Sequence, residues 1–310
     1  MPNGSSSARP ALLLPASLAC AAVLALTGCS GSGPGGDPSA APTALLPLPG
    51  PGDGDGGDGS GKDGGKGGAD GSGEPGKEEG ERDGGPLAGT TVLIDPGHNG
   101  GNAEAPEEIN EQVPSGPGEE KACDTVGAES ASGYPEHAFT LDLSLLLRDR
   151  LEAEGAEVVM TRSDGDGVGP CVNERAEIGN EAGADAAISV HADGGPESGS
   201  GFHVIAPGEV EGNEDIVVPS ARLAGLLRDA YAEGTGMDPA DYIAEEGLDE
   251  RTDLGGLNLS TVPKVFLEAG NMRNPGDAEL LEDGEWRERA ADAITGAVVD
   301  FLTGAEGERP

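Results

Sequence analysis

The chain is short of positive charge. Its 310 residues include 18 Lys and Arg against 58 Asp and Glu, which gives a formal net charge of −40 at pH 7. The region 89–310 is itself strongly acidic, so the charge does not come from one tail alone. Such a surface repels polyanions, which argues against binding of nucleic acid through bulk electrostatics. The acidity fits solubility or adaptation to salt better than a specific cationic partner.

Long apolar runs are also missing. No segment reaches the roughly 18 consecutive apolar residues that a membrane-spanning helix needs. The nearest one, 11–26, has the length and position of an export signal. It ends in Leu26-Thr27-Gly28-Cys29, the pattern at which bacterial lipoprotein signals are cleaved. We expect residues 1–28 to be a lipoprotein signal peptide with the lipid on Cys29; an ordinary secretory signal is the alternative.

The next segment, 29–88, has few apolar residues and is mainly Gly, Pro, Ser and Asp. A chain of this composition cannot bury enough surface to offset its conformational entropy, so we expect a disordered linker. A coil of this length spans roughly 40–45 Å between its ends. It would hold a folded domain, 89–310, away from a membrane surface.

Cysteine is scarce, and no CxxC pair is present among the four. Cys20 and Cys29 belong to the leader, which leaves Cys123 and Cys171 in the folded part. In an exported protein such a pair is expected to form a disulfide. Closing this loop would stabilise the fold by about 4 kcal/mol in the chain-entropy model. Zinc binding by the two cysteines is the alternative.

From residue 89 onward, predicted strands alternate with predicted helices. Apolar runs predict strands at 92–94, 157–161, 186–191, 202–206 and 265–267. Amphipathic spacing predicts helices at 136–154, 172–182, 217–232 and 278–302. This alternation predicts a single three-layer αβα domain with a mostly parallel, twisted sheet.

Two of the chain's four histidines stand at the ends of predicted strands. His98 follows the first strand after a Pro-Gly turn, and His191 ends the strand 186–191. Ligands bind at the carboxyl ends of strands in open α/β sheets. Imidazole nitrogen suits zinc, which often takes a carboxylate as its third ligand. Each histidine alone is more simply structural, but the pair indicates a metal site.

Glu136 is the candidate for the third ligand because it begins the predicted helix 136–154. A carboxylate in the first turn of a helix also has an ordinary role, since it interacts with the positive helix end. Glu119 and Glu120 are weaker candidates because they lie in a loop rich in glycine and proline.

Glu268 directly follows the apolar residues 265–267. A charge there is costly unless it is paired or faces an opening. Facing a metal-activated water, this carboxylate would serve as general base and then as general acid. The alternative is a buried salt bridge, for example to Arg175 or Arg273.

Taken together, these segments resemble the zinc-dependent N-acetylmuramoyl-L-alanine amidases of the family-3 type over about residues 90–303. The resemblance is carried by DPGHNG, EHAFTLDLSLLLRDRLEAEGAEVVMTR, NERAEIGNEAGADAAISVHAD and VPKVFLEAGNMRN. It implies that His98, Glu136 and His191 bind Zn²⁺. It also implies that Glu268 is the catalytic carboxylate in hydrolysis of the amide bond between N-acetylmuramic acid and L-alanine in peptidoglycan.

The resemblance also assigns lesser roles. Arg175 and Asn180 would brace the sheet, and Arg251 falls near the cleft as a candidate for substrate binding. The segment 102–134 is longer than the usual loop of the family. His203 stands where many members have a glutamate or another polar residue, and we expect it to be a structural histidine with satisfied hydrogen bonds.

We therefore expect an exported amidase whose partner is peptidoglycan. It would be anchored through Cys29 to the outer face of the cytoplasmic membrane and would face the cell wall. The sequence implies neither nucleic acid nor an obligate protein partner. Two other functions remain open: a non-catalytic peptidoglycan-binding module, and a zinc peptidase that cuts within the stem peptide.

Overall fold

The computed structural model describes residues 84–304. The expected signal peptide and the lipidation site Cys29 lie outside this range. Leu87, from the end of the expected linker, is fully buried, and its backbone N–H donates to the carbonyl of Glu154. The packed chain therefore includes residues just before 89. Within the described range, no helix has both the length and the apolarity to cross a bilayer.

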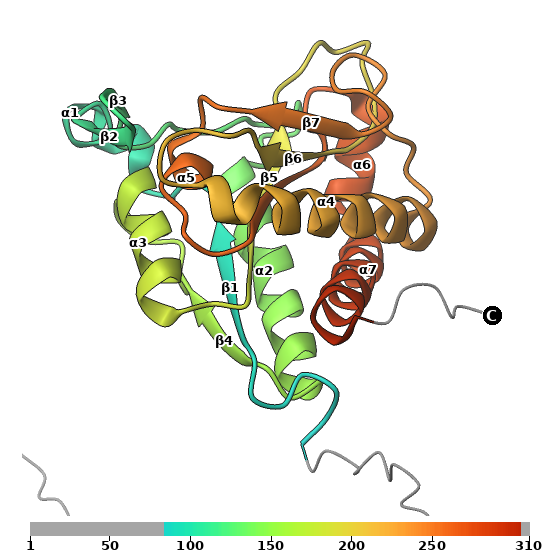
Figure 1. The fold of residues 1–310 in the computed structure, drawn as a ribbon. Helices are drawn as coiled ribbons and strands as arrows, with labels where there is room; N and C mark the ends of the chain where they lie inside the picture. Colours follow the sequence, from blue (N-terminus) through green and yellow to red (C-terminus); the bar gives the residue numbers. More distant parts are fainter. Residues whose placement is uncertain (1–83, 305–310) are drawn as a thin grey trace, which may run out of the picture. The chain divides into compact units, whose positions relative to one another are not determined.

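A six-stranded sheet in the order β4-β1-β5-β8-β6-β7 forms the centre of the domain (Figure 1). Its strands are β1 (Thr91–Pro96), β4 (Glu157–Met160), β5 (Ala186–Asp193), β6 (His203–Pro207), β7 (Leu248–Arg251) and β8 (Lys264–Asn271). Neighbouring strands pair in parallel except β6 and β8, which are antiparallel. The predicted mostly parallel sheet is confirmed. The edge strand β7 has the sequence LDER, in which one leucine precedes three charged residues, so no apolar run predicts this strand.

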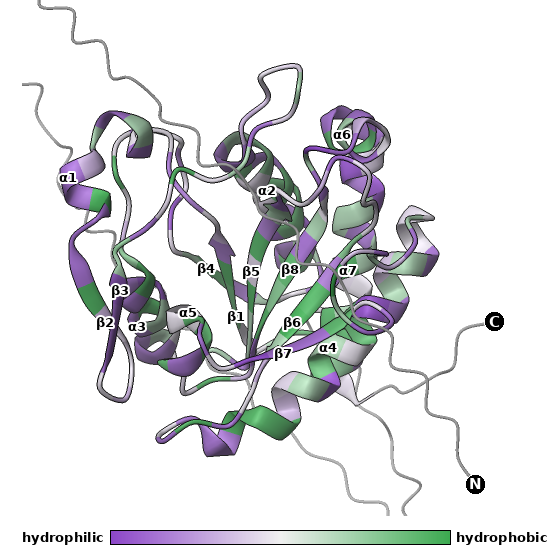
Figure 2. Ribbon diagram, turned by 90° about the horizontal axis from the view of Figure 1, so that it is seen from above, coloured by the Kyte–Doolittle hydropathy of each residue, from purple (hydrophilic) through white to green (hydrophobic). Residues whose placement is uncertain are grey.

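Helices flank the sheet. They are α2 (Glu136–Ala153), α3 (Val172–Ala182), α4 (Glu214–Thr235), the short α5 (Gly255–Asn258), α6 (Pro275–Glu282) and α7 (Gly284–Thr303). Helices α2 and α4 both pack against α7 and form one layer. Helices α3 and α5 pack against each other and form a second layer, in which α3 contacts β1 and α5 contacts β6. Figure 2 shows the central strands mostly apolar, whereas the helices around them carry both apolar and polar residues.

Alternation along β1 explains why both faces are covered. Val92 and Ile94 point into the large core, which they share with residues of α2 such as Phe139. Leu93 points the other way and packs with Ala187 in a small separate cluster. A strand whose two faces are both buried reads as a continuous apolar run, as this one does.

The predicted closing helix 278–302 is wrong in one respect, because two helices, α6 and α7, occupy this region. Asp283 between them has an extended backbone, with φ −79° and ψ 120°. Its carboxylate accepts a hydrogen bond from the backbone N–H of Trp286 at 2.8 Å. An aspartate in this geometry caps a new helix rather than continuing the old one.

The segment 102–134 is structured. It contains a 3₁₀ turn (Asn102–Glu104), α1 (Pro106–Ile109) and a hairpin of β2 (Gln112–Gly116) and β3 (Glu119–Ala122), which lies beside α3 in Figure 1. Directly after the hairpin, Cys123 is disulfide-bonded to Cys171 at the start of α3. The predicted disulfide is confirmed.

Candidate metal centre and active site

Three side chains from three elements meet at the carboxyl end of the sheet. His98 follows β1, Glu136 is the first residue of α2, and His191 lies in β5. Their ligand atoms lie within 4.8 Å of one another. Glu136 Oε1 is 3.2 Å from His98 Nε2 and 3.0 Å from His191 Nδ1. Two imidazole nitrogens and one carboxylate oxygen converging in this way form a donor set for zinc or a similar divalent ion.

The electrostatics of the three residues fit a bound cation. Burial lowers the pKa of His98, but the Glu136 and Asp124 carboxylates outweigh it and raise this pKa to about 10. Burial raises the pKa of Glu136, yet His98 and His191 lower it further than burial raises it. The site thus keeps an ionised, buried carboxylate that needs a positive charge. A divalent ion would displace the imidazole protons and supply that charge.

Backbone groups fix the Glu136 carboxylate. Its Oε2 accepts from the N–H of Ala128 at 2.7 Å, and its Oε1 accepts from the N–H of Ala192 at 3.1 Å. These hydrogen bonds stabilise the ionised form of the carboxylate and fix its orientation. The carboxylate is therefore positioned before any ligand arrives.

Asp124 fixes His98 from the other side. Nδ1 of His98 lies 3.1 Å from Asp124 Oδ1 and 3.1 Å from the carbonyl oxygen of Thr125. Both partners are acceptors, so Nδ1 keeps its proton. Nε2, which faces Glu136, is the nitrogen that would bind a metal ion once the ion displaces its proton. Asp124 is not among the site residues predicted from the sequence. Its only signal was its position directly after Cys123, in a segment whose path the sequence does not show.

The turn that carries His98 requires a glycine before it. A Cβ on Gly97 would lie 2.2 Å from Cε1 of His191. His98 itself has a φ of 60°, in the left-handed region that side chains rarely adopt. This strained turn brings the two imidazole rings to a centroid distance of 4.9 Å.

A buried network of charges lies beneath the site. Asp95 Oδ1 is 2.9 Å from Arg175 Nη1, and Asp95 Oδ2 is 3.2 Å from Lys264 Nζ. Arg175 Nη2 also donates to the carbonyl of His98 and lies 3.3 Å from Asp124 Oδ2. The predicted bracing role of Arg175 is therefore seen in its contacts. Asn180 braces a neighbouring loop, since its amide group bonds the carbonyl of Leu259 and the N–H of Thr261.

Glu268 of β8 lies opposite His191 of β5 and opposite His203 of β6, so all three side chains share one face of the sheet. The Glu268 side chain is half-buried, and its Oε2 is enclosed without a hydrogen-bond partner among the described residues. Burial raises the pKa of Glu268 well above its usual value, and the Glu136 and Asp193 carboxylates raise it further. No salt bridge to Arg175 or Arg273 is formed within residues 84–304.

Two further predictions have different outcomes. Arg251 lies in β7 beside the cleft, as expected, but its guanidinium is held by Asp253 through bonds of 2.8 and 2.7 Å. His203 is buried, but its Nδ1 has no partner within the described part of the chain. The expectation that the hydrogen bonds of His203 are satisfied is wrong.

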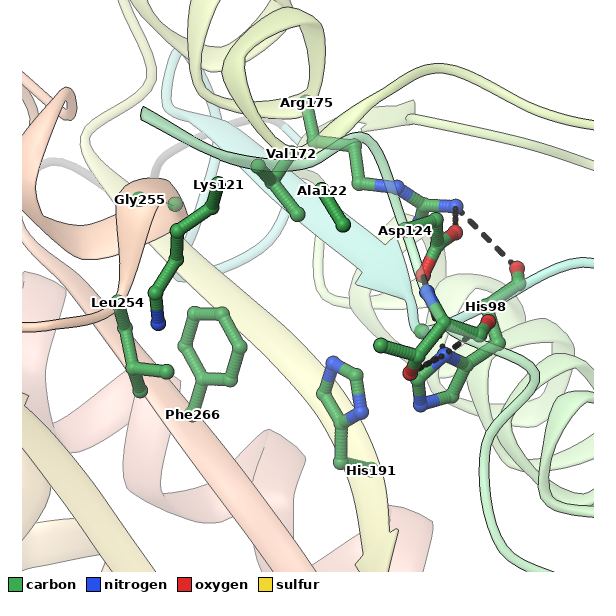
Figure 3. A pocket seen from close by; sticks show the side chains of 13 residues that line it. His98, Lys121, Ala122, Asp124, Val172, Arg175, His191, Leu254, Gly255 and Phe266 are labelled. Atoms are coloured by element: carbon green, nitrogen blue, oxygen red, sulfur yellow. Dashed lines mark hydrogen bonds and ion pairs between the residues drawn. The ribbon is translucent and has the colours of Figure 1, made fainter. Parts of the chain in front are cut away.

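Two cavities, of about 350 and 370 Å³, adjoin at His98 and His191 and form one cleft. We call the first the apolar half; Ala122, Val172, Leu254 and Phe266 line it, with Lys121 at one side (Figure 3). We call the second the polar half; Asp193, Arg251, Glu268 and Arg273 line it. Phe266 stacks on His191 with their ring centroids 5.1 Å apart and borders both halves.

The α/β domain places two histidines and a glutamate at the carboxyl end of its sheet, with an unpaired glutamate beside them in an open cleft. This combination is typical of metal-dependent hydrolases. The model of one such family, described as N-acetylmuramoyl-L-alanine amidase, matches residues 92–300. The chain belongs to this family. Its membership confirms the predicted family and the predicted amidase activity on peptidoglycan.

Several relatives agree with this assignment. The chain is 44% identical over 218 residues to N-acetylmuramoyl-L-alanine amidase Rv3717 of Mycobacterium tuberculosis, covering 70% of this chain and 88% of the relative. The crystal structure of the amidase Ami1 from Mycobacterium smegmatis matches with a TM-score of 0.66 and 42% identity, over 71% of this chain and 99% of that one. Ami1 from Mycobacterium abscessus matches with a TM-score of 0.64 and 43% identity, over 70% of this chain and 100% of that one.

Proposed function

We propose that this amidase uses a zinc ion held by His98, Glu136 and His191, and that Glu268 transfers the protons of the reaction. One juxtaposition carries the proposal: the three ligand atoms lie within 4.8 Å of one another, and an unpartnered carboxylate shares the same face of the sheet. Two imidazoles and a carboxylate are a donor set that zinc takes in catalytic sites, where a fourth position stays open.

When bound, zinc supplies Lewis acidity, which polarises the amide carbonyl and makes a water molecule easier to deprotonate. The chain's own residues do the rest. Glu268 takes a proton from the attacking water and gives it to the amine of L-alanine as the amide bond breaks. Burial raises the pKa of this carboxylate, which makes it a stronger proton acceptor than an exposed glutamate.

Substrate contact by Arg251 is part of this proposal. Its guanidinium lies in the wall of the polar half, and Asp253 holds it in one orientation through the bonds described above. That pairing leaves its Nη1 group available to donate to a polar group of the substrate. Because Asp253 already balances its charge, Arg251 would orient a polar group of the substrate by hydrogen bonding and would not neutralise a negative charge on it.

We also propose that the enzyme works outside the cytoplasmic membrane, anchored by a lipid on Cys29. The disulfide supports an oxidising compartment, where such bonds persist. The anchor rests on the sequence Leu26-Thr27-Gly28-Cys29 alone. Mass spectrometry of the mature amino terminus tests it: a diacylglycerol on Cys29 supports the anchor, and an unmodified terminus at another residue refutes it.

The function is tested by metal analysis joined to product analysis. Purified protein should contain about one zinc ion per chain. It should release from peptidoglycan stem peptides that begin with an intact L-alanine. Release of fragments cut within the stem would favour a zinc peptidase instead. A metal-free protein that binds peptidoglycan without releasing any peptide would favour a binding module.

A further inference from the structure

We propose that Arg273 binds a carboxylate of the stem peptide in the polar half of the cleft. The enzyme then prefers stems whose second residue, isoglutamate, has a free carboxylate over stems in which that group is amidated. This inference rests on the proposed function, because the roles given there to the metal centre and to Glu268 fix the orientation of the substrate.

The orientation follows from where Glu268 lies. Its carboxylate lines the polar half of the cleft and is absent from the lining of the apolar half. The amine that receives its proton is the nitrogen of L-alanine, so the peptide that continues from this residue extends into the polar half. The muramyl group then lies in the apolar half, where Ala122 and Val172 offer apolar surface to the lactyl group and the sugar ring, next to Phe266 of the shared wall.

The polar half is otherwise unfavourable for an anion. Glu136, Asp193 and Glu268 all line it. A peptide carboxylate entering this space needs a cation close by, or repulsion would exclude it. The chain as a whole does not attract anions, since its net charge is −40.

Arg273 is the cation with free donors. Within residues 84–304 its guanidinium forms no ion pair or hydrogen bond, whereas that of Arg251 is held by Asp253. Its position is nevertheless fixed, because its backbone N–H donates to Asn271 Oδ1 at 3.0 Å. Asn271 in turn donates to the carbonyls of two other loop residues at 2.7 and 2.9 Å.

Gly194 gives the Arg273 side chain its path along the wall. A Cβ at position 194 would lie 3.5 Å from Arg273 Nε and 3.2 Å from the Cβ of Ala128. The side chain therefore passes beside this glycine and reaches the wall of the polar half. An arginine in this state suits bidentate recognition of a carboxylate.

The test compares two muramyl dipeptides that differ only in this group, MurNAc-L-Ala-D-isoglutamate and MurNAc-L-Ala-D-isoglutamine. We expect the full-length zinc-loaded enzyme to have a KM about tenfold lower for the acid, the change that one charge-assisted hydrogen bond produces. Arg273→Gln should bring the two KM values together, and Arg273→Lys should restore part of the difference. Arg289→Gln, at an exposed arginine on α7, is the matched control and should keep the preference.

A binding measurement separates recognition from turnover. Calorimetry with Glu268→Gln enzyme should show tighter binding of L-Ala-D-isoglutamate than of L-Ala-D-isoglutamine, and adding Arg273→Gln should abolish the difference. Equal KM values and equal affinities for acid and amide would overturn the inference and leave the amidase function standing. Cleavage of neither dipeptide, with no release from intact peptidoglycan, would overturn the proposed function and the inference with it.

Discussion

The Asp124 carboxylate lies 3.1 Å from Nδ1 of His98, on the side of the imidazole that faces away from the metal position. Asp124 belongs to the long segment 102–134, and Cys123 next to it is tied to Cys171 by the disulfide. A segment that looks peripheral in the sequence therefore orients a metal ligand. Outer partners of this kind set the tautomer and the direction of a ligating histidine.

Replacing Asp124 by Asn should weaken zinc binding by about 10–100-fold, because the Nδ1–H of His98 loses its charged acceptor. The amide keeps the shape of the side chain, so the fold should remain. Competition with a chelator of known affinity measures the effect, and circular dichroism checks the fold. Asp166→Asn, at an exposed loop position, is the control. Equal zinc affinity in both variants would refute the role given to Asp124.

Glu268→Gln should lower kcat by at least about 100-fold, the contribution expected of a positioned general acid–base group. Zinc content should not change, since this side chain is outside the ligand set. Glu279→Gln, at an exposed position of α6, should retain full activity. The release of stem peptide and the metal content are measured on the same preparations. A wild-type rate in the Glu268 variant would exclude the proposed proton transfer.

Removing the metal should abolish activity and lower the melting temperature. The buried Glu136 carboxylate loses its divalent partner, and ligand binding stabilises a fold by about 2.7 kcal/mol at a ligand concentration of 100 Kd. Dialysis against a chelator, followed by calorimetric scanning with and without added zinc, tests this. An apo protein that melts at the same temperature as the zinc-loaded one would show that no metal is bound at this site.

Breaking the disulfide should affect stability and metal binding together. The Cys123→Ser and Cys171→Ser double variant loses a cross-link over 48 residues, which costs about 4 kcal/mol in the chain-entropy model. Because Asp124 follows Cys123 directly, His98 should also lose part of its support and zinc affinity should fall. Urea unfolding and zinc competition measure the two effects. Alkylation of both cysteines without reductant would show that the bond is absent in the natural protein.

The sequence made the metal centre predictable because each ligand stands at a recognisable boundary. His98 comes just after β1, His191 and Glu268 lie near the carboxyl ends of β5 and β8, and Glu136 starts helix α2. Local patterns predict such boundaries, and parallel topology brings strand ends together.

Asp124 and Arg273 could not be found in this way. Asp124 reaches His98 from a loop that is tied to the start of α3 by the disulfide. For Arg273 the sequence suggests only a salt bridge to Glu268. Within residues 84–304 its guanidinium is free, whereas Asp253 holds that of Arg251. The contact of Asp124 with His98 and the place of Arg273 beside Gly194 join segments distant in sequence, which composition and periodicity do not encode.

Gly97→Ala should damage the site without unfolding the domain. The added Cβ would lie 2.2 Å from Cε1 of His191, so this ring must move away from the metal position. We expect activity and zinc affinity to fall by at least about tenfold, since ligand geometry governs both. Gly225→Ala is the matched control: no atom lies within 4 Å of its new Cβ on helix α4, and alanine there should stabilise the helix by up to about 1 kcal/mol. Loss of the far-ultraviolet circular dichroism signal in the Gly97 variant would show instead that this glycine is needed for folding.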